Sequence, residues 1–219
     1  LPQASFDEVF SRLCANGAGP LPAVIELLEA RANLSRLLES SYIHPNGFFK
    51  IPLFESDYLG PKIRLHVWIP HRLTPSAIDT NIHTHHWSFD SFVMAGSLRH
   101  ITYLEARGTS YNKCRLSRRP SNGHVLHTIS KCELHIAEER QIGPNASYSL
   151  KATEIHQLFP SIHDRVTATL ILQHRHTEYL NHVYLPASVQ LEESEIVPTP
   201  ITEEDISAVI AELHCACMQ

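Results

Sequence analysis

The hydrophobic positions near the start of the chain repeat with the period of an α-helix, in which residues three and four apart share a face. The first apolar stripe comprises Phe6, Val9, Phe10 and Leu13. The second follows Pro22, a residue that favours the first turn of a helix, and comprises Val24, Leu27, Leu28, Leu34, Leu37 and Leu38. Asn16-Gly17 and Pro45-Asn46-Gly47 are turn signals that end the two stripes. We therefore predict two N-terminal helices within residues 1–47.

The pattern changes between residues 48 and 186 to short runs of β-branched and aromatic residues, separated by Gly, Pro, Asn and Asp. The candidate strands are FFKIPLFE, KIRLHVWIP, NIHTH, DSFVMAG, SLRHITYLE, VLHTIS, CELHIAE, SYSLKA, HQLFP, TATLILQ and HVYLP. Many short strands with turn signals between them are typical of a sandwich or barrel. Residues 187–200 predict an irregular connection. A last helix is expected from Thr202, capped with Asp205, with Ile206, Val209, Ile210 and Leu213 on one face.

These patterns predict a mainly β protein with one compact domain in three parts. Residues 1–47 form a helical extension, residues 48–186 a β-barrel, and residues 187–219 a linker and a C-terminal helix. The helical flanks could cover barrel edges or form the seam of a homodimer.

Composition excludes several classes of protein. The chain has 219 residues and a net charge of −5, which argues against a general nucleic-acid binder, and we interpret the basic run KCRLSRR at 113–119 as a solvated loop. No apolar run has the roughly 18 residues of a membrane span, and the N-terminal residues lack a signal-peptide pattern. Five cysteines without a CxxC motif indicate reduced thiols and a cytoplasmic protein.

Histidine is the residue type that departs from ordinary usage, with 16 in the chain. His83 and His85 stand two apart, so on a strand their side chains project from the same face. Two imidazoles placed in this way can reach one ion, and imidazole suits Fe, Zn, Cu and Ni. The best third ligand is His156, and the alternatives are His135, His174 and His176. His86 alternates to the opposite face and is expected in a turn or at the surface.

These residues resemble the motifs of the cupin superfamily over about residues 48–186. His83-Thr84-His85 matches the HxH of the first motif, Asp90 falls where that motif has Glu, and Gly96 closes its hairpin. Gly143 begins the second motif and His156 supplies its histidine. The resemblance implies a cupin-like β-barrel (double-stranded β-helix or jelly roll). Five residues rather than six separate Asp90 from Gly96, so a site of three histidines is favoured over one that also includes a carboxylate, and Asp90 stays a candidate fourth ligand.

Within cupins the arrangement is similar to the thiol dioxygenases, especially the cysteine dioxygenase branch. In that family an HxH pair and a distant histidine hold Fe(II) without a carboxylate ligand. The resemblance places Lys50 near the family's basic residue that binds the substrate carboxylate. Tyr179 or Tyr184 would correspond to its late tyrosine, which has a catalytic role, whereas the cysteine that crosslinks to that tyrosine in some members has no counterpart.

The expected strand 62–69 supplies further candidates for substrate binding. Arg64, His66 and Trp68 share one face, and Ile63, Leu65, Val67 and Ile69 share the other. The polar and aromatic face either lines the barrel, with the Arg64 guanidinium forked to a substrate carboxylate, or lies outward in solvent. On the strand after Gly96, His100 is a candidate to orient a metal ligand.

We therefore expect a non-haem Fe(II) dioxygenase or oxygenase that acts on a small, carboxylate-bearing substrate together with O2, without a nucleic-acid or membrane partner. The first alternative is a cupin with non-redox metal chemistry, a lyase, isomerase or decarboxylase with Zn, Mn or Ni. The second is a ligand-binding cupin without catalysis.

Overall fold

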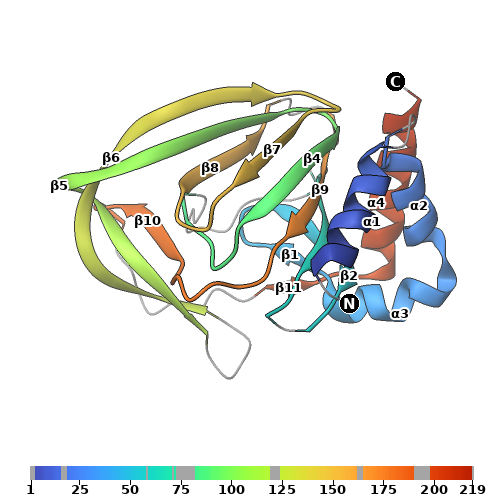
Figure 1. Cartoon of the computed structure of the whole chain (residues 1–219), viewed down its shortest axis with the longest axis horizontal. Helices are drawn as coiled ribbons and strands as arrows, with labels where there is room; N and C mark the ends of the chain where they lie inside the picture. The colour runs from blue at the N-terminus through green and yellow to red at the C-terminus, as the bar shows by residue number, and fades with distance from the viewer. Residues whose placement is uncertain are drawn as a thin grey trace.

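A computed structural model describes residues 3–15, 19–57, 59–70, 72, 82–118, 124–161, 165–189 and 198–218. Two antiparallel β-sheets face each other, and a layer of helices covers the outer face of one of them (Figure 1). The large sheet has the order β11 (Thr199–Pro200), β1 (Tyr42–His44), β2 (Phe48–Glu55), β3 (Lys62–Trp68), β9 (Thr167–Gln173), β4 (Phe89–Ala95), β7 (Ser147–Leu150). The small sheet contains β10 (His182–Pro186), β5 (Leu98–Arg118) and β6 (His124–Ile142), and β8 (Ile155–Pro160) also pairs with β5.

The connections between the sheets define the fold. From β6 onward successive strands alternate between the sheets, with β7 and β9 in the large sheet and β8 and β10 in the small one. Antiparallel strands that alternate in this way between two facing sheets make a jelly roll. The mainly β barrel-like fold predicted from the sequence is therefore confirmed by strand connectivity.

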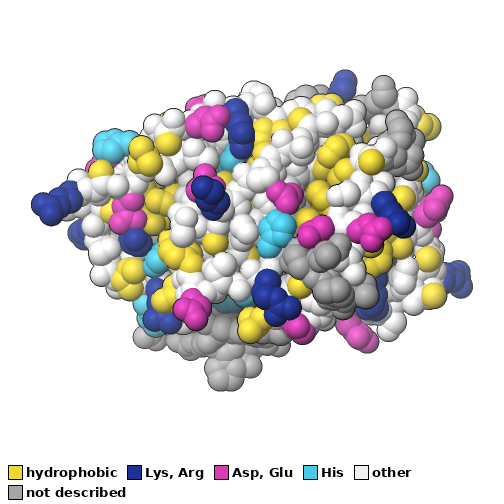
Figure 2. All heavy atoms as spheres, in the orientation of Figure 1, with side chains coloured by type: hydrophobic (Ala, Val, Ile, Leu, Met, Phe, Trp, Pro, Cys, Tyr) yellow, Lys and Arg dark blue, Asp and Glu magenta, His cyan; other side chains and the backbone are white. Residues whose placement is uncertain are grey.

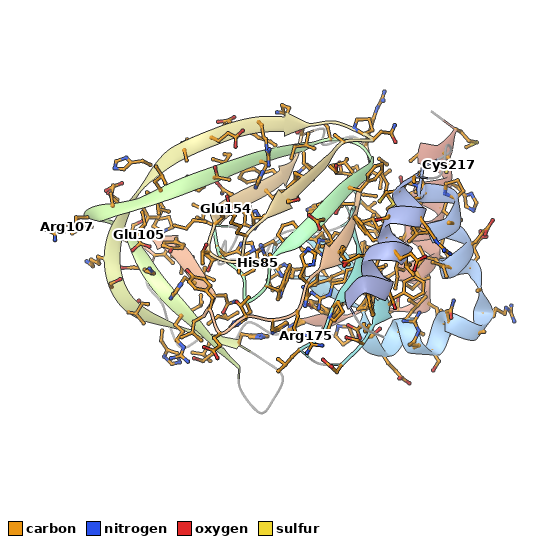
Figure 3. All side chains as sticks on the ribbon, in the orientation of Figure 1. His85, Glu105, Arg107, Glu154, Arg175 and Cys217 are labelled. Atoms are coloured by element: carbon orange, nitrogen blue, oxygen red, sulfur yellow. The ribbon has the colours of Figure 1, made fainter. Side chains whose placement is uncertain are left out.

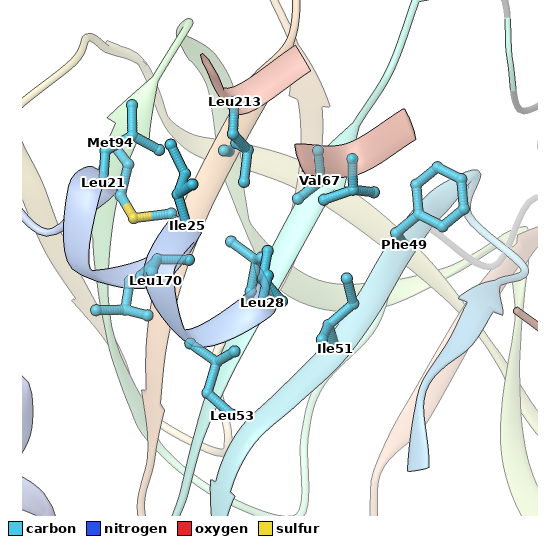
Figure 4. Close-up of a cluster of buried hydrophobic side chains, with 14 of the residues drawn as sticks. Leu21, Ile25, Leu28, Phe49, Ile51, Leu53, Val67, Met94, Leu170 and Leu213 are labelled. Atoms are coloured by element: carbon cyan, nitrogen blue, oxygen red, sulfur yellow. The ribbon is translucent and has the colours of Figure 1, made fainter. Parts of the chain in front are cut away.

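The helices pack on the large sheet through the alternate residues of its strands. They are α1 (Gln3–Ala15), α2 (Leu21–Glu29), α3 (Arg31–Ser40) and α4 (Glu203–Cys217). In β3, Ile63, Leu65 and Val67 are completely buried and belong to the cluster that also contains Leu28 of α2 and Leu213 of α4 (Figure 4). Because neighbouring strand residues point to opposite faces, Arg64, His66 and Trp68 must point into the space between the sheets.

Three local predictions differ from the structure. The second apolar stripe is divided at Ala30, whose extended backbone ends α2 and precedes α3, so three helices stand where two were expected. Residues 113–118 of the expected basic loop lie in β5, paired with β6 and β10. Of the expected strand 81–85, Asn81 lies outside the described residues, and only His83 pairs, in isolated bridges.

Other predictions hold. Thr202 and Asp205 form the expected capping box of α4, and Ile206, Val209 and Leu213 of that helix are buried. All five cysteines are free. None of the helices in the described ranges has both the length and the apolar character needed to cross a membrane.

Candidate metal centre

The backbone around His83 brings three distant histidines together. His83 and His156 of β8 form an isolated antiparallel bridge, in which each N–H donates to the other's carbonyl at 3.0 Å. The N–H of His85 donates to the Ala152 carbonyl at 3.1 Å. Thr84 between them is completely buried, and its hydroxyl accepts from the N–H of His182 at 2.8 Å. With Thr84 anchored on the opposite side, His83 and His85 both face His156.

The imidazole nitrogens lie at distances suited to one metal ion. One ring nitrogen from each of His83, His85 and His156 lies within 4.8 Å of the other two, and Nε2 of His85 is 2.9 Å from Nε2 of His156. Three nitrogens that each bind an ion at about 2 Å lie roughly 3 Å from one another, so modest ring rotations would bring all three onto one cation. Figure 3 shows His85 in the space enclosed by the two sheets.

Burial keeps these rings in the form that binds metal. Desolvation, with a smaller contribution from neighbouring histidines, lowers the pKa of His85 and of His156 well below the ordinary value. Both are therefore neutral imidazoles near pH 7, and a neutral ring nitrogen is a ligand for Fe, Zn, Cu or Ni. The donor set of these three side chains fits such an ion.

His100 contacts the far side of His156, as expected for a residue that orients a ligand. Its Nε2 is 3.3 Å from Nδ1 of His156, and its Nδ1 accepts from Nε of Arg140 at 3.4 Å. Since arginine only donates, His100 carries its proton on Nε2 and donates to His156, which in turn donates from Nε2 to His85. Metal binding at Nε2 of His156 requires that nitrogen to be unprotonated, so it reverses the direction of the His156–His100 hydrogen bond.

Two adjoining cavities lie beside the histidines. The inner cavity, with a volume of about 70 Å³, lies between the sheets and is lined by aromatic side chains that include Phe48, Trp68 and Tyr148. The outer cavity has a volume of about 300 Å³ and is lined by Lys50, Lys62 and Arg64. His83, His85, Lys50 and Trp87 belong to both linings, so the three-histidine group stands where the cavities meet.

The structure places the predicted substrate-binding residues around these cavities. Lys50, His66 and Trp68 line the inner cavity, and Lys50 and Arg64 line the outer one. The open question about strand 62–69 is thereby settled, because its polar and aromatic face points into the barrel. Trp87 and Phe89 also line the inner cavity.

Asp90 lies apart from the three histidines. It follows Phe89, which lines the inner cavity, so strand alternation turns Asp90 to the other face of β4. There it pairs with Nε2 of His174 at 2.9 Å and accepts from the Ser149 hydroxyl. This placement does not support Asp90 as a fourth ligand and removes His174 from the alternatives for the third.

The two tyrosines suggested by the family resemblance also lie outside both cavity linings. The Tyr184 hydroxyl donates to Glu105 at 2.8 Å within a separate buried cluster. The Tyr179 hydroxyl is 3.3 Å from Nδ1 of His182. Neither hydroxyl is placed for chemistry at the three histidines in this structure.

Of the other histidines considered from sequence, His135 is exposed on β6, whereas His86 and His176 line the outer cavity with stacked rings 5.9 Å apart. His86 lies in a bend and is partly exposed, which agrees with the expectation of a turn or surface position.

Sequence reasoning missed several residues of the inner cavity. Tyr148 of β7 and Thr169 of β9 line it, and burial raises the pKa of Tyr148 to about 12. Each sits on a strand whose alternation was visible in the sequence. Which of the two faces is the inner one depends on how the sheets pair, and no local pattern carries that information.

Comparisons with known proteins add little to this geometry. No protein-family model matches the sequence, and no curated protein matches it. Among solved structures, the chain is similar to Rru_A2000 from Rhodospirillum rubrum, described as a cupin-2 domain, with 11% identity and a TM-score of 0.26 over 78% of this chain and 80% of that chain. A likeness at that level carries no argument about the site, so the fold rests on strand connectivity and the site on its own geometry.

Proposed function

We propose that this protein is a metal-dependent enzyme of the cupin type, in which His83, His85 and His156 hold a single ion next to a cationic substrate cavity. The observation that carries the proposal is the convergence of three imidazoles, from two distant segments, at the junction of two cavities. His156 is buried and His83 and His85 are half-buried, and one cation could accept a ring nitrogen from each of the three side chains.

Fe(II) is the ion we propose, and the reaction is the oxygenation of a small carboxylate by O2. Three histidine side chains would hold this ion, and it would supply positions where substrate and O2 could bind. The absence of a carboxylate from the described ligand group agrees with the family resemblance, in which three histidines suffice. Zn, Mn or Ni in a lyase, isomerase or decarboxylase is the competing proposal, because imidazole binds these ions as well.

The chain's own residues would bind and orient the substrate. Arg64 and Lys50 would hold its carboxylate, since a guanidinium forks to a carboxylate through two hydrogen bonds. His100 would orient the His156 ring through a hydrogen bond between its own Nε2 and Nδ1 of His156. The aromatic wall of the inner cavity would exclude water from the reacting atoms, which strengthens every charge interaction there.

Metal analysis tests the proposal. Protein purified without oxygen should contain about one iron per chain, and His85→Ala should contain almost none. His135→Ala is the matched control, because this histidine is exposed and was an alternative ligand; its metal content should equal that of the wild type. Equal metal in wild type and His85→Ala would reject the site.

Nitric oxide separates the two kinds of chemistry. It binds Fe(II) that has an open position and produces a characteristic electron paramagnetic resonance signal. The Fe(II)-loaded wild type should give this signal and His85→Ala should not. One zinc, manganese or nickel per chain in the purified protein, with no such iron, would instead support the non-redox alternative.

A further inference from the structure

The outer cavity is lined by two half-buried basic side chains, Lys50 and Arg64, that form no ion pair among the described residues. Lys62 pairs with Glu55 at 2.9 Å, but no carboxylate in the described part of the chain pairs with Lys50 or Arg64, and Nε of Arg64 is buried without a hydrogen-bond partner. Both side chains flank one indole, with the Lys50 Nζ 5.9 Å and the Arg64 Cζ 5.5 Å from the ring centre of Trp87. Burying unpaired charge is costly, and an anion between the two would offset that cost.

Among the described residues, those that line the outer cavity include no aspartate or glutamate. Two of its basic side chains, Lys50 and Arg64, lie over Trp87, whose ring centre is 4.3 Å from that of His85. Burial, followed by the neighbouring Arg64 and Lys62, lowers the pKa of Lys50 well below its ordinary value. A bound anion supplies the opposite charge that this amine lacks.

The inner cavity has the opposite character. Phe48, Trp68, Phe89, Leu158 and Ile171 are among its lining residues, so it suits an apolar group. Besides the three histidines and Lys50, this wall has a polar spot where His66 of β3 pairs with Thr169 of β9 in the large sheet. Nε2 of His66 and Oγ1 of Thr169 are both buried without a partner in the described chain, so a ligand in this cavity can gain a hydrogen bond there.

We propose that the ligand of this site is an amphipathic monocarboxylic acid. Its carboxylate lies against Arg64 and Lys50 in the outer cavity, and its short apolar body passes Trp87 into the inner cavity. A single hydrogen-bonding group on that body meets His66 and Thr169. The proposal rests on the proposed function for the metal, which would stand beside the middle of the ligand. It adds the chemical class of the ligand, a carboxylate with an apolar end rather than a polar metabolite.

The chain provides its own reporters for a binding test. It has two tryptophans; Trp68 lines the inner cavity and Trp87 lines both. Tryptophan fluorescence should therefore change when either cavity fills. The variant Trp68→Phe leaves only the reporter shared by the two cavities, and Trp87→Phe leaves only the one specific to the inner cavity.

The experiment titrates the protein with acetate, butyrate, phenylacetate, butanol and phenyl phosphate, each with and without added Fe(II). Butyrate and phenylacetate should bind at least about tenfold more tightly than acetate, which lacks the apolar body, and than butanol, which lacks the charge. In Trp87→Phe, phenylacetate should still change the fluorescence of Trp68 and acetate should not. Tighter binding of phenyl phosphate than of phenylacetate would overturn the choice of a carboxylate.

Variants assign the two ends of the ligand. Arg64→Gln should weaken butyrate binding by about tenfold or more, because a charged hydrogen bond is lost. The matched control is Arg99→Gln, since Arg99 is exposed and already paired with Glu139 at 2.7 Å; its affinity should equal that of the wild type. Ile171→Phe and, separately, Leu158→Phe should weaken phenylacetate binding and leave acetate unchanged.

The outcomes separate this inference from the proposed function. Equal affinity for butyrate and butanol, or an Arg64→Gln affinity equal to that of the control, would overturn the inference whatever the metal content. Selective acid binding by a protein whose metal content is the same in wild type and His85→Ala would sustain the inference as a binding site and reject the metal centre.

Discussion

Single side chains around His156 decide how well it can bind a metal ion. Arg140 fixes the proton of His100 on the nitrogen that faces His156, whereas metal binding needs His100 to accept from His156. Removal of His100 should weaken metal binding, because it leaves Nδ1 of His156 unpartnered. Removal of Arg140 should not, because His100 can then accept freely.

We therefore predict that His100→Phe lowers the affinity of the metal-free protein for Zn(II) by about 10- to 100-fold, and that Arg140→Met keeps or increases it. Competition with a coloured chelator measures both affinities. A general packing effect would weaken binding in both variants alike, and that result would contradict the orienting role of His100.

Gly96 illustrates a residue whose backbone conformation is required by the turn between β4 and β5. Its φ is +68°, and a Cβ there would lie 2.6 Å from the Val166 carbonyl oxygen. Gly96→Ala should therefore reduce the free energy of unfolding by about 1–3 kcal/mol, measured by urea denaturation. Gly143→Ala is the control, because its Cβ would meet nothing within 4 Å, and its stability should change by less than about 0.5 kcal/mol. Equal stability of the two variants would show that the turn tolerates a side chain.

At the scale of elements, α4 depends on its first turn. The Thr202 hydroxyl accepts from the N–H of Asp205 at 3.2 Å, and the Asp205 carboxylate accepts from the N–H of Thr202 at 2.9 Å. Thr202→Ala should cost about 1 kcal/mol of stability without a change in metal content. Ser207→Ala, in the exposed middle of the same helix, should leave the thermal midpoint nearly unchanged. A Thr202→Ala midpoint equal to that of Ser207→Ala would mean that the cap does not stabilise the helix.

Elements with a local cause were predictable from the sequence. The cap and buried stripe of α4 are local patterns, and so is the alternation of β3. The break at Ala30 was not predictable, because the apolar stripe continues past it and no Gly or Pro marks it. The length of β5 was not predictable either, since most residues of its middle part are exposed and continue the strand by pairing with β6 and β10.

The residues of the candidate site were likewise predictable from the sequence only in part. The HxH spacing identified His83 and His85, and the second motif identified His156. Asp90 was a weaker candidate because its face of β4 depends on the register within the large sheet, and that register places it beside His174. Thr169 and Tyr148 were missed because their role comes from strands brought together by topology.

At the scale of the whole molecule, the distribution of charge bears on how an anion could be selected. Acidic and basic side chains are interspersed on the face shown in Figure 2, which agrees with the small net charge of −5. Lys50 and Arg64 line the outer cavity, half-buried and without an ion pair among the described residues. The anion selection proposed above would therefore depend on these two cavity side chains.

The helices and the barrel share one hydrophobic core, which joins α2 and α4 to β2, β3 and β9 (Figure 4). A helical extension that packs in this way should not unfold by itself, so we predict one cooperative unfolding transition for the entire chain. The helical circular dichroism signal and the fluorescence of Trp68 and Trp87 should change at the same urea concentration.

Leu28→Ala tests this coupling, because Leu28 of α2 is 2% exposed and lies against the sheet. It should destabilise the chain by about 2–5 kcal/mol and shift both signals together, although both tryptophans are in the barrel. Leu104→Ala, at a side chain that is 64% exposed, should shift neither by more than about 0.5 kcal/mol. If Leu28→Ala moved the helical signal to lower urea while the tryptophan signal stayed in place, residues 1–47 would be a separate folding unit and the barrel, with its metal centre, would be stable without them.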